Sequence, residues 1–319
     1  MSLEVLLFIA LVPPALLLFL IWKVDKLEHE PWGLLLLVVG LGAASGILAL
    51  ILEIALDAPI AALFESNYAV YLIADNFVGV ALMEELSKML VIMIVIWRHK
   101  QFNCRFDGIV YGAASSLGFA ALENVKYVMN YGFETGIVRA FTAIPGHFIF
   151  GVFMGAMIGA AKCAKYDGKQ GKKNLFLLLA ILVPTLLHGY YDYLLSVPAY
   201  MGDTEGLWVL YLLAMVIGAA ILIIVGAKHD RVIDPSLGYS GEAVATQSDQ
   251  LQRLSQQLTG QSVTVPTQAV YGQANAYVPQ TQAGQVQYVP QAAQQVQYVP
   301  QAQAGQVQYP GQGQYPTQQ

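Results

Sequence analysis

The chain has 319 residues, of which 56% are hydrophobic and only 12% are charged, and its formal net charge is −5. Soluble globular proteins are about 25% charged, so this composition excludes an ordinary water-soluble domain and favours a chain solvated mostly by lipid. The sequence contains no basic stripe, so nothing in it indicates a nucleic-acid partner. The two cysteines, Cys104 and Cys163, follow no metal or disulfide spacing.

Seven stretches of the chain are long and apolar enough to cross a membrane as helices. A hydrocarbon core of about 30 Å takes about 20 mostly apolar residues to cross. The predicted spans are Leu3–Trp22, Gly33–Leu56, Asp75–Trp97, Asp107–Val128, Ile137–Ala161, Leu175–Val197 and Leu207–Ala227. The first run is too long for the core of a signal peptide, so we interpret it as an uncleaved span.

The piece between the second and third spans, Asp57–Ile73, is short and amphipathic, which is typical of an interfacial or re-entrant helix. Glu53 and Asp57 lie near one end of the second span, where we expect them to reach the membrane interface. The predicted fold class is therefore an all-α polytopic membrane protein with about seven transmembrane helices, and this piece is the candidate for one extra helix.

Lysine and arginine are distributed unequally between the two sides of the predicted bundle. Positive residues follow the first, third, fifth and seventh spans, whereas the alternate connections are poor in them. Connections rich in Lys and Arg stay in the cytoplasm. This pattern predicts a multi-pass protein of the cell membrane, with its N-terminus outside and its C-terminal tail in the cytoplasm.

The C-terminal part of the chain has a different composition. No charged residue follows Arg253, and a Tyr-Val-Pro unit recurs at Tyr277, Tyr288 and Tyr298. Such a segment buries too little apolar surface to offset its ordering entropy. We therefore divide the chain into a transmembrane domain, residues 1–230, and a disordered Gln/Tyr/Pro-rich cytoplasmic tail, residues 231–319. The tail is either a spacer or a binding segment for protein partners.

Ionisable residues inside the predicted spans are the candidates for function, because a charge at the bilayer centre costs at least about 2.5–3.5 kcal/mol. The third span contains two adjacent carboxylates and a lysine, and its Glu84 and Lys88 can pair at i,i+4. The next three spans add further polar groups. The full set is Glu84, Glu85, Lys88, Glu123, Asn124, His147, His188 and Asp192.

These groups lie at similar depths in their helices. With a rise of about 1.5 Å per residue, Glu84, His147 and His188 are each roughly 15 Å from the outer end of their spans, and Glu123 and Asp192 are roughly 8 Å from it. Residues scattered independently over four helices need not agree in this way. We therefore expect one shared, water-accessible site near the midplane or in the outer half of the membrane.

Two kinds of hydrolysis suit this set. In the first, a carboxylate activates water while a histidine or lysine polarises a carbonyl or protonates a leaving amine. In the second, Glu123, His147 and His188 hold a zinc ion with its bound water, and Glu84 or Glu85 acts as the base. No H-E-x-x-H motif is present, so the sequence leaves the cofactor open, with Zn²⁺ as the candidate.

Four short motifs occur in order along the chain: E-E-x-x-K at Glu84, F-x-x-x-E-N ending at Asn124, P-G-H ending at His147, and H-x-x-x-D from His188. Their order and placement over residues 1–230 resemble the PrsW family of intramembrane proteases, which is related to the CAAX-protease and bacteriocin-processing (ABI) superfamily. The resemblance implies glutamate-dependent or metal-dependent hydrolysis of membrane-anchored anti-sigma factors on the extracytoplasmic side. The tail is not part of that pattern.

We therefore expect an intramembrane endopeptidase that acts on a membrane-anchored protein. Glu84 and Glu85 activate the water, and Lys88 keeps one of them ionised. Glu123, His147 and His188 complete the site as ligands or as proton and oxyanion groups. In addition, Asn124 donates a hydrogen bond and Asp192 orients His188. The alternatives are a proton-coupled transporter, in which the same groups form a relay, and a non-catalytic scaffold whose tail recruits partners.

Overall fold

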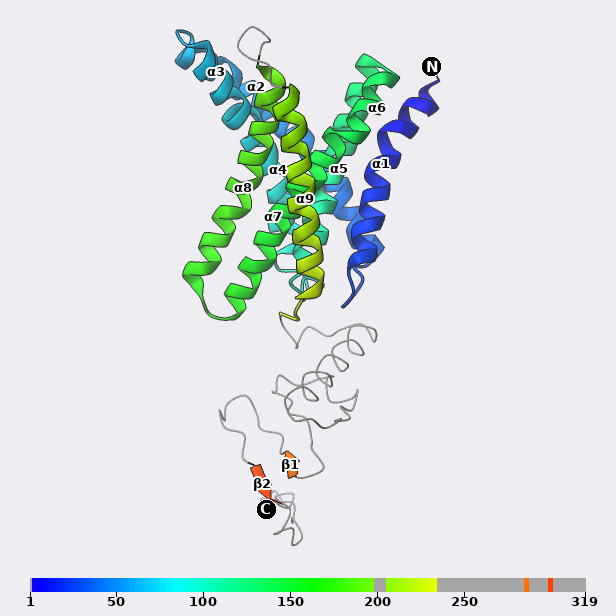
Figure 1. The fold of residues 1–319 in the computed structure, drawn as a ribbon, viewed down its shortest axis with the longest axis vertical. Coiled ribbons are helices and arrows are strands. Elements are labelled where there is room, and N and C mark those ends of the chain that lie inside the picture. The colour runs from blue at the N-terminus through cyan, green and yellow to red at the C-terminus, as the bar shows by residue number, and fades with distance from the viewer. Residues whose placement is uncertain (1, 198–204, 234–283, 287–297, 301–319) are drawn as a thin grey trace, which may run out of the picture. The chain divides into compact units, whose positions relative to one another are not determined.

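The computed structural model describes residues 2–197, 205–233, 284–286 and 298–300, which form two units that are considered separately, Met1–Tyr239 and Ser240–Gln319. The first unit is a helix bundle (Figure 1). Its elements are α1 (Leu3–Val24), α2 (Trp32–Phe64), α3 (Tyr68–Ala74), η1 (Asp75–Ala81), α4 (Leu82–Val91), η2 (Ile92–Ile96), α5 (Asp107–Tyr131), α6 (Phe133–Phe141), α7 (Ala143–Tyr166), α8 (Gln170–Ser196) and α9 (Glu205–Lys228).

Each predicted span is helical, with shifted boundaries. Among the described residues, five stretches are long and apolar enough to cross a membrane: Leu3–Val24, Trp32–Phe64, Phe133–Tyr166, Gln170–Ser196 and Gly206–Lys228. The other two predicted spans, around α4 and α5, hold more ionisable groups. They can do so because much of their surface faces protein: all residues of α5 from Asp107 to Ala120 are buried. The all-α membrane fold is confirmed, and the count of seven stays a prediction.

The amphipathic piece Asp57–Ile73 does not form one separate helix. Its first part continues α2 to Phe64, and its last part is α3, which runs without a break through η1 and α4 to Ile96. The segments η1 and η2, on either side of α4, are π-helical, so the backbone is wider just before and after the E-E-x-x-K motif. Such wide turns often accompany functional sites in helices.

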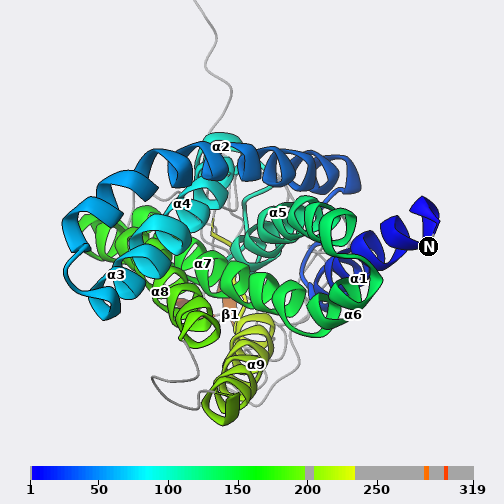
Figure 2. The ribbon, with the colours of Figure 1, turned by 90° about the horizontal axis from the view of Figure 1, so that it is seen from above.

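Helices α5 and α7 make the closest contact in the bundle, and α7 lies between α5, α8 and α9 (Figure 2). Glycines line this contact. A side chain at Gly112 would collide with the Gly151 carbonyl, and one at Gly155 would collide with the Gly108 carbonyl. Small residues four apart let two membrane helices approach at backbone distance. This close approach brings the polar residues of α5 within reach of those of α7.

In the second unit, the described residues form two short strands, β1 (Gly284–Val286) and β2 (Tyr298–Pro300), which pair antiparallel with Gln285 opposite Val299. Apart from these strands, the predicted tail from residue 234 onward lies outside the described residues.

Candidate active site

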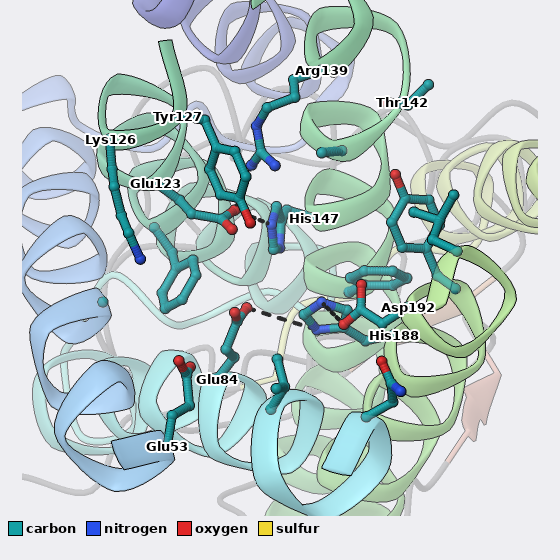
Figure 3. A pocket seen from close by; sticks show the side chains of 18 of the residues that line it. Glu53, Glu84, Glu123, Lys126, Tyr127, Arg139, Thr142, His147, His188 and Asp192 are labelled. Carbon is teal, nitrogen blue, oxygen red and sulfur yellow. Dashed lines mark hydrogen bonds and ion pairs between the residues drawn. The ribbon is translucent and has the colours of Figure 1, made fainter. Parts of the chain in front are cut away.

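A cavity of about 820 Å³ opens within the bundle and is lined from α2, η1, α4, α5, α6, α7, α8 and α9 (Figure 3). Five of the eight predicted site residues are on its wall: Glu84, Glu123, His147, His188 and Asp192. The expectation that groups from four successive spans meet in one place agrees with this arrangement. Apolar side chains such as Phe119 and Phe150 complete the wall, which suits a peptide segment with few charges.

Lys88 is the centre of the polar network. Its ammonium contacts Glu84 Oε2 at 3.0 Å and Glu85 Oε1 at 2.7 Å, both one turn away on the same helix. It also lies 3.1 Å from His147 Nδ1 on α7 and sits over the ring of Phe119, 4.1 Å from its centroid. The Lys88 and Glu85 side chains are both 0% exposed. The Lys88 ammonium therefore compensates the charge of two buried carboxylates and holds the His147 ring in place.

The two adjacent glutamates have different surroundings. Glu84 lines the cavity, whereas Glu85 does not and lies behind it against α8. Glu85 Oε1 contacts His188 Nδ1 at 2.9 Å, while Glu85 Oε2 is buried with no hydrogen-bond partner. Adjacent residues on a helix point about 100° apart, which accounts for this division. Of the pair, only Glu84 can meet a substrate in the cavity.

Each histidine is held at both ring nitrogens. His147 contacts Lys88 through Nδ1 and Glu123 Oε2 through Nε2, the latter at 2.9 Å. His188 contacts Glu85 through Nδ1 and, at 3.2 Å, Asp192 Oδ2 through Nε2. The predicted pairing of Asp192 with His188, one turn apart on α8, is thus present. The two rings meet edge to face, with 5.2 Å between their centroids.

Arg139 is a member of the network that the sequence analysis did not assign to the site. It lies on α6 and contacts Glu123 Oε2 at 2.6 Å and Asn124 Oδ1 at 2.9 Å. Glu53, which we expected at the membrane interface, also lines the cavity. The sequence did hold a signal for Arg139, because this charged residue lies two positions inside a predicted span. Its partners could not be predicted from the sequence, because they depend on how the chain turns between α5 and α6.

Asn124 is turned away from the cavity wall. Its amide nitrogen donates to the Ala10 carbonyl of α1 at 3.3 Å, and its amide oxygen accepts from Arg139. In this structure Asn124 therefore connects α1, α5 and α6, and its predicted role as a donor in the reaction stays a prediction.

Four residues are close enough to hold one metal ion: Glu84, Glu85, His147 and His188 each offer a donor atom, and all four atoms lie within 4.8 Å of one another. Two imidazoles and two carboxylates suit zinc in type. Glu123, one of the three predicted ligands, lies beyond this group on the Nε2 side of His147. The Lys88 ammonium already contacts three of the four residues, so a metal would have to displace it from them.

Residues 30–223 match the model of a family described as "PrsW family intramembrane metalloprotease". Among curated relatives, Protease PrsW of Oceanobacillus iheyensis is 37% identical over 186 residues, which is 58% of this chain and 80% of that protein. Protease PrsW of Shouchella clausii is 33% identical over 60% of this chain and 83% of its own length. No solved structure matches the chain. Because the family model covers more than half of the sequence, this chain belongs to the PrsW family of intramembrane proteases.

Proposed function

We propose that the chain hydrolyses a peptide bond of a membrane-anchored protein by means of a water molecule that Glu84 activates. The observation that supports this most directly is the position of Glu84 on the cavity wall, with Glu85 excluded from it. Membership in a family of intramembrane peptidases favours this activity over the transporter and the scaffold.

Each group of the network has a role in this proposal. Glu84 accepts a proton from water, and the oxygen attacks the scissile carbonyl carbon. His188, on the cavity wall, donates a hydrogen bond to the developing oxyanion or a proton to the departing amine from Nε2, once this nitrogen leaves Asp192. His147 is held at both ring nitrogens, so we assign it the role of keeping Lys88 and Glu123 in place. Lys88 has no access to the cavity, so we assign it a positioning role: it holds Glu84 and His147 at fixed distances.

The donor set around Glu84 also suits a zinc ion, which when bound would lower the pKa of a coordinated water and polarise the carbonyl. In that case Glu84, Glu85, His147 and His188 would be its ligands, with Lys88 displaced. The Glu123 carboxylate would then orient His147 through Nε2, as carboxylates commonly do for metal-bound histidines.

The test compares an isosteric variant of Glu84 with a control variant in proteoliposomes that contain a single-span peptide substrate. We expect Glu84→Gln to lower the cleavage rate by about 10²–10⁴-fold, the usual contribution of a general base. The matched control is Asp57→Asn, an exposed carboxylate on α2 outside the cavity, which should leave the rate unchanged. Cleavage at the wild-type rate by Glu84→Gln would reject Glu84 as the base.

The membrane side of the reaction is a second part of the proposal. The Lys and Arg distribution and the family resemblance both favour cleavage near the extracytoplasmic side, with an anti-sigma-factor-like substrate. Both native cysteines are buried, so a cysteine introduced at Ser2 would be the accessible thiol of the described residues. We expect an impermeant maleimide to label Ser2→Cys in intact cells. Labelling only after cell lysis would show that the N-terminus lies in the cytoplasm, opposite to the predicted orientation.

A further inference from the structure

A second group of buried carboxylates lies away from the candidate active site. Asp25 directly follows α1, Glu30 precedes α2, and Asp107 is the first residue of α5. Each offers an oxygen within 4.8 Å of the other two, and all three residues are buried. We call these three residues the Asp25 cluster. Asp107 and Glu123 are sixteen residues apart on α5, which separates the two sites by about 24 Å along the helix.

The Asp25 cluster has oxygens without partners. Neither carboxylate oxygen of Asp25 has a hydrogen-bond partner in good geometry, although the residue is only 1% exposed. Asp107 Oδ1 is also buried without a partner. None of the three residues forms an ion pair with a lysine or arginine within the part of the chain that the structure describes. Buried carboxylates left in this state cost several kcal/mol each.

Two residues of the cluster, Asp107 and Glu30, accept hydrogen bonds from neutral groups around them. Asp107 Oδ2 accepts from the backbone N–H groups of Asn103 at 2.9 Å and Cys104 at 2.6 Å. The Tyr111 hydroxyl donates to Glu30 Oε2. Carboxylates that ligate metals are commonly oriented by such bonds from outside the coordination shell. The bonds to Asp107 and Glu30 therefore hold two of the three carboxylates in place, and each of the three residues has an oxygen near those of the other two.

The geometry points to a binding site for a hard divalent cation in the Asp25 cluster, and we propose that Ca²⁺ binds there through Asp25, Glu30 and Asp107. Calcium takes oxygen ligands at about 2.3–2.6 Å, so two oxygens on opposite sides of one ion are about 4.6–5.2 Å apart. The three oxygens lie within 4.8 Å of one another, so all three can reach one calcium ion. An all-oxygen set does not favour zinc or copper. Bound calcium would join the ends of α1, α2 and α5.

Protons are the competing occupant of these oxygens. Burial, together with the charge of the neighbouring Asp230, raises the pKa of Asp25 to about 8. The backbone amides of Leu27 and Glu28 lie near enough to oppose this rise. A cluster that holds only protons would bind no calcium, so direct measurement of the bound ion separates the two cases.

The experiment measures radioactive Ca²⁺ bound to the purified full-length chain by equilibrium dialysis, after the chain is stripped with chelator. We expect one ion per chain, with affinity reduced at least tenfold in Asp25→Asn and in Asp107→Asn. Asp57→Asn, the exposed control, should bind as wild type does. Glu84→Gln should also bind as wild type does, because the active-site carboxylates are not involved. No bound calcium in wild type, or equal affinity in Asp25→Asn, would overturn the proposal.

A second measurement locates the ion without altering a carboxylate. Terbium substitutes for calcium and is excited through nearby aromatic rings, and Trp22 donates to the Glu30 carbonyl from the adjacent turn. We expect calcium-displaceable terbium emission in wild type. Trp22→Phe should lower the emission per bound ion while calcium affinity stays within twofold. Unchanged emission in both Trp22→Phe and Tyr111→Phe would place the ion elsewhere and overturn the assignment.

Discussion

The two carboxylate clusters of this protease solve the same physical problem in different ways. In the active-site cluster, Glu84, Glu85 and Glu123 each contact a lysine, an arginine or a histidine from the bundle. In the Asp25 cluster, the carboxylates lie near one another and accept from neutral donors such as Tyr111 and backbone amides, and among the described residues no lysine or arginine pairs with them. Glu84 and Glu85 are as fully buried as the three residues of the Asp25 cluster, so for them the difference lies in the compensating charge and not in access to water.

The carboxylates of the candidate active site are compensated by side chains of the chain itself. We propose that those of the Asp25 cluster are compensated by a bound cation. A buried charge is tolerated when an opposite charge and hydrogen bonds accompany it. Lys88 supplies that charge at the candidate active site, where we propose that Glu84 activates water. Nothing in the described chain supplies it to the Asp25 cluster. Three substitutions test this comparison of the two clusters, and we expect the largest effect at Lys88.

Replacing Lys88 with methionine would make the active-site cluster resemble the Asp25 cluster. The substitution leaves two adjacent buried carboxylates without a counter-charge, and breaking a buried pair in this way costs about 3–5 kcal/mol. We expect a large fall in the thermal midpoint in detergent together with loss of cleavage. Lys172→Met, at an exposed position of α8, is the matched control. A midpoint equal to that of the control would show that Lys88 does not stabilise the pair.

The parts of the active site that lie within one helix were predictable from spacing. Glu84 with Lys88 and His188 with Asp192 are i,i+4 pairs, and both contacts are present in the structure. The meeting of groups from four predicted spans in one cavity was predictable as well, because the rise per residue converts sequence position into height along a helix. These inferences need no knowledge of how the helices are rotated.

Contacts between helices were not predictable in the same way. Arg139 pairs with Glu123, sixteen positions earlier, only because the chain turns at Gly132 between α5 and α6. Asn124 follows Glu123 directly, yet it faces α1. The sequence did not predict the Asp25 cluster, because acidic residues are common in the loops next to helix ends. Only the packing of three chain segments brings them together.

A second prediction concerns α5, which contributes to both clusters. Gly112 lies between Asp107 and Glu123, where α5 meets the Gly151 carbonyl of α7 at backbone distance. We expect Gly112→Leu to force the two helices apart, at the cost of about 1–3 kcal/mol typical of overpacking. The displacement should weaken the Glu123–His147 contact and lower cleavage. Gly33→Leu on α2, where an added side chain meets nothing within 4 Å, is the control.

The smallest effect is expected at Arg139, which shares the charge of Glu123 with His147. Both side chains of the Arg139–Glu123 pair are partly exposed, at 12% and 20%, so water compensates for part of the loss. Arg139→Gln should leave the Glu123–His147 contact in place but less well oriented. We expect cleavage to fall about tenfold, equivalent to about 1.4 kcal/mol in the barrier, and to do so through kcat more than KM. Arg139→Lys, which keeps the charge but cannot bond Glu123 and Asn124 in one plane, should recover only part of the rate. Full recovery by lysine would mean that charge alone matters, and that the bonds from Arg139 to both residues do not position His147.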